Sequence, residues 1–315
     1  MNDLHDLILN DHWIKANRGK KNSVDPRKPY AWLVEKEMIP SGRVEDVAII
    51  FLTNRECPYC CLMCDLWKNT TDNSVPPGAI VDQIEFALEN LPSARHLKLY
   101  NGGSFFDTGA IPPEDYGKIA ELVRDFETVI VESHPKLINE KCLAFRKMLK
   151  PDLQVAIGLE ICEPVLLGKL NKRMTPDDFR RAVSFLRQSG ISSRAFILLR
   201  PPFLSEEEGV YWAERSIDYA FSSGAECCTI IPVRAGNGAM DILHEMGLFT
   251  PPSIVSLERV LEYGINLKAG RVFADLWDLE LFSCCDECYS ERYNRLLSMN
   301  LNQFVPSPVQ CTCSG

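Results

Sequence analysis

The residues best suited to chemistry form a short cysteine-rich loop, Cys57-Pro-Tyr-Cys60-Cys61-Leu-Met-Cys64. Three of them, Cys57, Cys61 and Cys64, have the spacing C-x3-C-x2-C. A [4Fe-4S] cluster contains four irons and is usually held by four thiolates. Three thiolates on one loop would hold three irons and leave the fourth iron open to a small molecule. The spacing therefore predicts an iron-sulfur cluster that binds a second ligand.

The same loop can be counted as two C-x2-C pairs, Cys57 with Cys60 and Cys61 with Cys64, a spacing typical of zinc ligands. Zinc sites usually separate their pairs by about a dozen residues or more, and here the pairs adjoin. We therefore favour the cluster, with Cys60 as a small buried side chain rather than a ligand. Zinc, or a redox or buried role, is the alternative.

The composition limits the class of protein. The 315 residues allow one large α/β domain or two smaller ones, and 46% apolar residues suffice for a full core. No apolar run has membrane-spanning length, and the mixed, acidic N-terminus does not resemble a signal peptide. Thirteen cysteines then favour a reducing, cytoplasmic compartment and metal binding over disulfides. A net charge of −9 argues against a broad nucleic-acid surface.

Charge sets the first 45 residues apart. Six basic residues lie close together there: Lys15, Arg18, Lys20, Lys21, Arg27 and Lys28. We interpret residues 1–45 as a solvated arm that ends in a short helix at 30–37. The alternative is a contact for RNA or another polyanion. Residues 46–280 then form the core, and residues 281–315 form a cysteine-rich tail.

The core alternates apolar strands with amphipathic helices. The expected strands are 47–53, 96–101, 127–132, 153–160, 193–199 and 227–233, followed by a last strand at 271–276. Such alternation predicts βαβ units and a parallel sheet. In a β/α barrel the functional residues lie where strands end. Those ends carry the cysteine loop, Asn101-Gly102-Gly103-Ser104, Glu132, Glu160 and Arg200, although each residue alone could be a cap or loop residue.

The motifs together resemble the radical S-adenosylmethionine (radical SAM) superfamily, in which such a cysteine triad follows the first strand of a partial barrel. The order of KLYNGGSF at 98–105, VESHP at 131–135, GLE at 158–160, Asn171-Lys172 and LLRPPFL at 198–204 is similar to one branch of it. That branch contains the archaeosine-synthase radical SAM subunit and, more distantly, the elongator catalytic subunit.

The resemblance implies a fold and an activity. The fold is an α/β partial (β/α)6 TIM-like barrel with an N-terminal arm and a cysteine-rich C-terminal extension. The activity is reductive cleavage of S-adenosylmethionine (SAM) at a [4Fe-4S] cluster, which makes a 5'-deoxyadenosyl radical that abstracts hydrogen from a substrate. The branch suggests a modified tRNA nucleoside as substrate. A radical enzyme acting on a small metabolite or peptide, or a non-catalytic iron-sulfur or zinc protein, is the alternative.

The resemblance also implies partners and a SAM site. The partners are an electron donor such as flavodoxin or ferredoxin, and tRNA, with no membrane. Residues 101–104 are expected at the amino group of SAM, and Glu132 is included among the cofactor-binding residues. From position and charge, we expect Glu160 to accept the ribose hydroxyls and Arg200 to pair with the carboxylate.

The tail predicts a second metal centre. Cys285, Cys288, Cys311 and Cys313 are expected to converge near the barrel mouth and bind an auxiliary iron-sulfur cluster or zinc, with Cys284 as the alternate fourth ligand. Free thiols are the alternative. The residues between the two pairs are expected to form one short helix packed on the barrel. The other cysteines, Cys142, Cys162, Cys227 and Cys228, are expected in the core.

Overall fold

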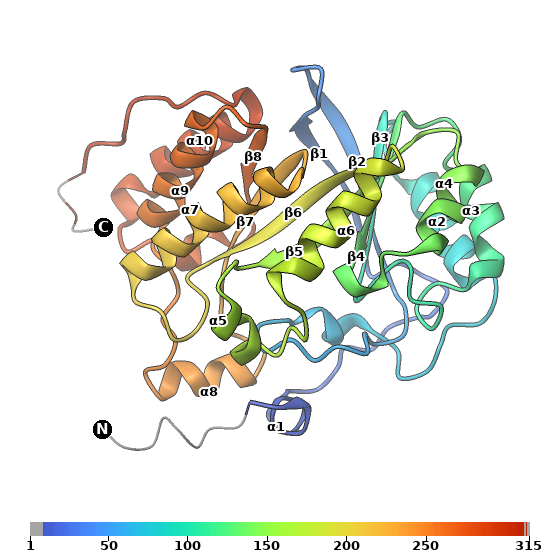
Figure 1. Ribbon diagram of the computed structural model, residues 1–315, viewed down its shortest axis with the longest axis horizontal. Coiled ribbons are helices and arrows are strands. Elements are labelled where there is room, and N and C mark those ends of the chain that lie inside the picture. The colour runs from blue at the N-terminus through green and yellow to red at the C-terminus, as the bar shows by residue number, and fades with distance from the viewer. Residues whose placement is uncertain (1–8, 312, 314–315) are drawn as a thin grey trace.

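A computed structural model describes residues 9–311 and 313 of the chain. Its centre is one eight-stranded sheet in the order β1-β2-β3-β4-β5-β6-β7-β8, curled into a half-barrel (Figure 1). The strands are β1 (Ala31–Met38), β2 (Val44–Leu52), β3 (His96–Asn101), β4 (Thr128–Ser133), β5 (Asp152–Glu160), β6 (Ser192–Leu199), β7 (Cys227–Pro232) and β8 (Arg271–Ala274). Strand β1 runs antiparallel to β2, and every other neighbouring pair is parallel. The predicted TIM-like partial barrel is confirmed.

Helices connect the parallel strands, and several of them, including α2, α6, α7 and α9, cover the outer face of the sheet (Figure 1). They are α1 (Asp11–Ala16), α2 (Ala79–Asn90), α3 (Tyr116–Leu122), α4 (Glu140–Met148), α5 (Pro164–Lys169), α6 (Pro176–Gln188), α7 (Glu206–Ser223), α8 (Ala239–Glu245), α9 (Ile254–Asn266) and α10 (Asp286–Asn302). In the sequence, Thr175 followed by Pro176 and Asp178 predicts the start of a helix, and α6 does begin there, because Thr175 and Asp178 form a capping box.

The two faces of each strand have different neighbours. On β3, Leu97 and Leu99 are fully buried and share one apolar cluster with Ile80 of α2. Tyr100 lies on the opposite face, and its ring centroid is 6.2 Å from that of Phe196 on β6. Both aromatic rings are only partly buried. The outer face of the sheet is therefore a packed core, whereas the lumen side is less completely filled.

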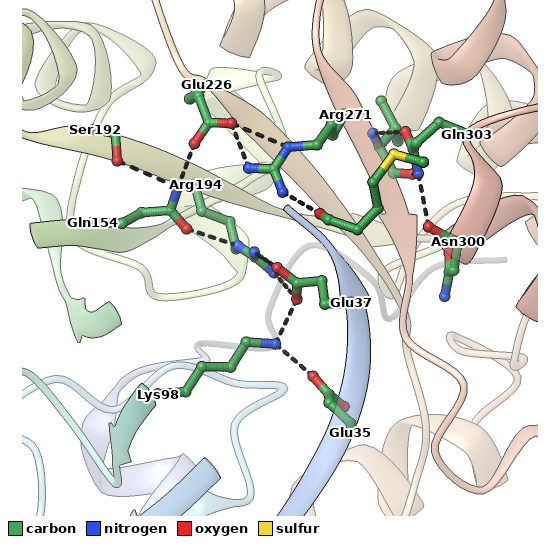
Figure 2. Close-up of polar contacts among 12 residues, drawn as sticks. Glu35, Glu37, Lys98, Gln154, Ser192, Arg194, Glu226, Arg271, Asn300 and Gln303 are labelled. Atoms are coloured by element: carbon green, nitrogen blue, oxygen red, sulfur yellow. Dashed lines mark hydrogen bonds and ion pairs between the residues drawn. The ribbon is translucent and has the colours of Figure 1, made fainter. Parts of the chain in front are cut away.

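Ion pairs fill the lumen at the end of the barrel where the parallel strands begin. Figure 2 shows the carboxylate of Glu37 on β1 between Lys98 of β3 and Arg194 of β6. The Lys98 ammonium lies 2.6 Å from Glu37 Oε2, and Arg194 bonds to both oxygens of the same carboxylate. Burial alone would raise the pKa of Glu37, but Arg194 and Lys98 hold it well below its usual range. One ionised carboxylate thus ties three strands together.

Arg271 extends this network to the last strand. Its guanidinium donates to the backbone carbonyl of Met38 at the end of β1 and to Glu226, which follows α7 (Figure 2). Strands β1 and β8 are the two edges of the sheet. The contact between Arg271 and Met38 therefore brings the first and last strands together at one end of the barrel.

The predicted short helix at 30–37 is wrong, because residues Ala31–Met38 form β1. Its sequence contains good helix formers, Glu35, Lys36 and Glu37. The paired strand β2 follows directly in the sequence, but the ion partners of the two glutamates, Lys98 and Arg194, lie far along the chain. In β1 both glutamates bond to Lys98 of β3. Tertiary ion pairing thus overrides local propensity. No helix among residues 9–311 is long and apolar enough to cross a membrane.

The Glu37→Gln substitution should lower the free energy of unfolding by about 3 kcal/mol, because it leaves two buried cations without their shared carboxylate. Chemical denaturation at pH 7 measures this. The folded-state pKa of Glu37 is lowered, so its contribution is present above about pH 4 and is lost as the pH falls below that value.

Glu35→Gln is the matched control, since the Glu35 carboxylate also binds Lys98 but its side chain is 34% exposed. It should cost less than about 1 kcal/mol. Equal losses in the two variants would contradict the role given to Glu37.

Candidate functional site

Distant asparagines hold the cysteine loop in place. The side-chain amide of Asn171 donates to the carbonyl of Cys60 over 2.7 Å. The amide of Asn237 donates to the carbonyls of Leu62 and Cys64 over 2.8 and 3.1 Å. The loop has little secondary structure of its own, so these bonds fix its backbone.

The three predicted cluster ligands lie close enough to influence one another electrostatically. Burial raises the pKa of Cys57 and Cys64 to about 12 and that of Cys61 to about 11, and neighbouring thiols of the triad add to each shift. Cys60 is buried, and the charges nearest it include Arg18 of the N-terminal arm. The role of the triad as cluster ligands stays a prediction, and metal binding there would have to deprotonate these neutral thiols.

The Gly-Gly turn after β3 contacts this loop. A Cβ atom on Gly103 would lie 3.3 Å from the Cβ of Cys57, so a larger residue would crowd the loop. The N–H of Gly102 donates to Asn54 Oδ1 over 3.1 Å. The side-chain amide of Asn101 is buried, and neither its nitrogen nor its oxygen has a hydrogen-bond partner among the described residues. A polar ligand at this strand end would satisfy it.

A buried ion pair stands beside the thiols. Lys172 Nζ lies 2.5 Å from Glu160 Oε1, and the ammonium lowers the pKa of both Cys57 and Cys61. Glu160 ends β5 at an irregularity in the ladder and has φ 63°, a conformation that costs a non-glycine residue about 1–3 kcal/mol. A Cβ on Gly158 would lie 2.6 Å from Lys172 Nζ and closer still to the Glu160 carboxylate. Gly158 therefore makes room for the pair.

His134 links the loop to this ion pair. Its ring stacks on Tyr59 at 3.8 Å between centroids. Its Nδ1 accepts the N–H of Lys136, which leaves Nε2 to donate to the carbonyl of Lys172 over 3.0 Å. Burial lowers the pKa of His134 to about 3, so the ring is neutral with a fixed tautomer. The N–H of His134 donates to Ser104 Oγ over 2.8 Å.

Glu132 is the acid at the end of β4. Burial raises its pKa to about 8, even though Lys172 and the backbone N–H of Asn101 favour the charged form. At neutral pH the carboxyl is therefore mostly protonated. Burial raises the pKa of Tyr30, and the charge that Glu132 carries above its own pKa adds to that shift, so the two side chains share one region.

Arg200 already has protein partners. Its guanidinium bonds to Glu206 at the start of α7 and to the carbonyl of Pro251 over 2.8 Å. Its role at the SAM carboxylate stays a prediction, and SAM would have to compete with Glu206 for it.

A cavity of about 100 Å³ lies where β6 and β7 end, next to the cysteine loop. Its walls include Met63 and Asp65 of that loop and Arg234. Arg234 is held by Asp275 over 3.0 Å.

The N-terminal arm packs on the cysteine loop. Ile14 of α1 is buried in an apolar cluster with Leu62. Arg18 and Lys21 both pair with Glu56, over 2.7 and 2.8 Å. Part of the predicted basic cluster therefore serves to hold the arm, while Lys15, Lys20 and Lys28 are exposed.

The tail cysteines converge. The Sγ atoms of Cys285, Cys288, Cys311 and Cys313 all lie within 4.8 Å of one another, so this group can bind a metal in addition to the first site. The group lies at the start of α10, which forms the helix predicted between the two cysteine pairs.

Sequence reasoning gave no role to Lys172 or Asn237. Lys172 belongs to the quoted Asn171-Lys172 motif, so a signal was present. Nothing local marks Asn237 as a partner of a loop more than 170 residues away.

No protein-family profile matches the chain. An uncharacterised protein of Methanocaldococcus jannaschii is 24% identical over 98% of this chain and 93% of its own length. The archaeosine synthase beta subunit of Thermococcus kodakarensis is 31% identical, and the match covers 50% of this chain and 51% of that protein. The chain thus spans about half the length of this latter relative.

Solved structures share the fold. Methylornithine synthase (PylB) superposes with a TM-score of 0.58 at 15% identity, over 86% of this chain and 75% of that one. The Elp3 protein of Methanocaldococcus infernus superposes with a TM-score of 0.54 at 13% identity, over 81% of this chain and 63% of that one.

The chain shares the fold of these structures and carries the predicted three-cysteine motif, and the relatives bear out the predicted resemblance. The shared fold is consistent with the predicted class, a radical SAM enzyme with a [4Fe-4S] cluster and SAM as cofactors. Within that superfamily, the chain resembles the archaeosine synthase beta subunit over half of its length.

Gly158→Ala should separate Glu160 from Lys172, because the new methyl group would overlap both side chains. We expect a loss of about 1–3 kcal/mol in stability and a lower iron content after anaerobic reconstitution. Gly168→Ala is the control, since nothing lies within 4 Å of a Cβ there. Normal iron content in Gly158→Ala would refute the positioning role of the pair.

Glu132→Gln should flatten the pH dependence of stability. The folded-state pKa of Glu132 is raised to about 8, so the folded chain binds more protons than the unfolded chain between about pH 4.5 and 8. Stability therefore falls as the pH rises through this window, and the glutamine variant should lose that fall. Thermal unfolding of both proteins at pH 6 and pH 9 measures this difference in stability. The same pH dependence in the variant as in the wild type would show that another group is responsible for it.

Proposed function

We propose that this chain is an enzyme that cleaves SAM reductively and uses the resulting radical to modify a tRNA nucleoside. Cys57, Cys61 and Cys64 would hold the [4Fe-4S] cluster, and Cys60 would not. When bound, the cluster supplies one electron to SAM, and the 5'-deoxyadenosyl radical removes a hydrogen atom from an unactivated carbon. The contact between Gly103 and Cys57 carries the proposal, since it brings a backbone turn of the SAM-binding type against the triad.

The chain's own residues supply orientation and charge. Lys172 places a positive charge beside thiolates whose cluster would be anionic, and Glu160 holds that ammonium in place. Asn101 offers an unsatisfied amide, and the Gly102-Gly103 turn allows close backbone approach. The protonated carboxyl of Glu132 can donate a hydrogen bond at neutral pH. SAM's ribose and carboxylate would meet Glu160 and Arg200.

The substrate part of the proposal has separate support. The relatives named archaeosine synthase subunit beta match half of this chain at 30–31% identity. A tRNA base must leave its stack to reach an enclosed site, and the mouth of the half-barrel is the face where the reactive groups gather. The exposed Lys15 and Lys20 on the arm beside the cysteine loop can contact phosphates. Flavodoxin or ferredoxin would supply the electron.

Alanine at Cys57, Cys61 or Cys64 should abolish 5'-deoxyadenosine formation in the anaerobically reconstituted, dithionite-reduced protein. Cys60→Ala, the matched control from the same loop, should retain most of the activity because Cys60 is not a ligand. Liquid chromatography of the quenched reaction provides the measurement. Protein that takes up no iron at the triad, or equal losses in all four variants, would contradict the proposal.

The substrate is tested in the same assay. Unfractionated archaeal tRNA should stimulate 5'-deoxyadenosine formation and acquire a changed nucleoside, whereas a tRNA transcript without modified bases should not. Stimulation by small metabolites or peptides instead would overturn the tRNA assignment and leave the enzyme class standing.

A further inference from the structure

The four tail sulfurs are spaced as around one metal ion. The Sγ atoms of Cys285 and Cys311 lie 3.8 Å apart, and those of Cys288 and Cys313 lie 3.6 Å apart. A tetrahedral ion with Zn–S bonds near 2.3 Å places its sulfurs ~3.8 Å from one another. A four-iron cluster instead gives each thiolate its own iron, which spreads the sulfurs further apart. The spacing therefore fits a single ion.

The surroundings of these sulfurs are also built for thiolates. Arg292 Nε lies 3.3 Å from Cys288 Sγ, and the guanidinium is itself fixed by Glu258 of α9. The N–H of Cys313 points to Cys311 Sγ over 3.5 Å. Four thiolates around a divalent ion carry net negative charge, and a buried arginine and a backbone donor offset it. Such outer contacts orient metal ligands.

Helix α10 begins within the first cysteine pair, with Cys285 at its N-cap and Cys288 in its first turn, and it also covers the last strand. Asn300 accepts the N–H of Ala274 over 2.8 Å and donates to its carbonyl over 2.9 Å. Gln303 does the same for Val272 over 2.7 and 2.8 Å. Two side-chain amides thus occupy hydrogen-bonding positions that a ninth strand would take on β8.

The same helix reaches the other edge of the sheet. Helix α10 contacts both β1 and β8, the first and last strands in the sheet order. It therefore lies across the open side of the half-barrel. The cysteine pairs sit at both ends of this segment, with Cys285 at the N-cap of α10 and Cys311 nine residues after its last residue, Asn302.

We propose that Cys285, Cys288, Cys311 and Cys313 bind one tetrahedral Zn²⁺ whose role is to clasp α10 across the open side of the barrel. The ion joins Cys285 and Cys288, at the start of α10, to Cys311 and Cys313, which follow the helix. It thereby holds Asn300 and Gln303 on the edge of β8. Metal binding supplies free energy for folding to a segment of this kind. The site is separate from the predicted SAM cluster in both ligands and role.

The first test measures metal in the full-length chain. The triple variant Cys57→Ala, Cys61→Ala, Cys64→Ala should contain one zinc per chain and no iron after anaerobic reconstitution. Cys288→Ser and Cys313→Ser should lose the zinc and keep the iron of the first site. Cys284→Ser, the neighbouring control, should keep both. Cobalt substitution of the triple variant should give the visible absorption of a tetrahedral thiolate site.

Each other outcome overturns the inference. Iron and sulfide retained by the triple variant would mean that the tail binds an auxiliary cluster. Absence of both metals would mean that the tail holds free thiols, and loss of zinc in Cys284→Ser would mean a different ligand set. None of these results affects the test of the proposed SAM cluster. That test measures 5'-deoxyadenosine formation by the variants of Cys57, Cys61 and Cys64.

The second test concerns the clasp. Hydrogen exchange of the Val272 and Ala274 amides should accelerate at least tenfold when a chelator removes zinc from the full-length protein, because their acceptors are on α10. The Ile197 amide, in the central strand β6, serves as the internal control and should not change. Chelation of the wild-type chain avoids reliance on a variant that fails to fold. Unchanged exchange at residues 272 and 274 would show that the ion does not hold α10.

Discussion

The buried carboxylate of Glu37 is the constraint on which the barrel depends. It pairs with Lys98 and Arg194 together, so removal of this carboxylate leaves two buried cations without the partner they share. It also constrains the register of β1 on β2, because a slip of one residue would turn Glu37 out of the lumen and Lys36 into it. Charge complementarity thus adds to the short hairpin between β1 and β2 in specifying where the first strand pairs, and it fills the floor of the barrel.

Backbone strain gathers at the opposite end of the barrel. Glu160 and Arg200 end neighbouring strands with φ values of 63° and 51°. Each is held by an ion pair, Glu160 with Lys172 and Arg200 with Glu206. Such conformations persist only where surrounding contacts over-determine them. Paired charges on strands of ordinary conformation therefore stabilise the floor of the barrel. At the mouth, the strained backbone lowers stability but fixes the directions of the Glu160 and Arg200 side chains.

The features that could be predicted are those that depend on residues close together in the sequence. The cysteine spacing, the strand-helix alternation and the Thr175 cap are all local, and the structure has the predicted fold and cap. Strand β1 was missed because the ion partners of Glu37 that favour its extended form, Lys98 and Arg194, lie 61 and 157 residues away, although its strand partner β2 follows directly in the sequence. The partner of Arg200 was missed for a different reason. Glu206 is only six residues away, but its direction depends on how α7 docks.

The anchors of the cysteine loop have a consequence for how the protein is made. The hydrogen-bond donor to the carbonyl of Cys60 is Asn171, 111 residues later in the chain. The donor to the carbonyls of Leu62 and Cys64 is Asn237, a further 66 residues on. During synthesis the thiols leave the ribosome long before the groups that fix them, and domains of this kind complete their fold only when the later strands arrive. For the proposed cluster, iron-sulfur delivery to this loop would therefore be a late event in the life of the chain, and it would require a reducing environment that protects the thiols until the barrel has closed.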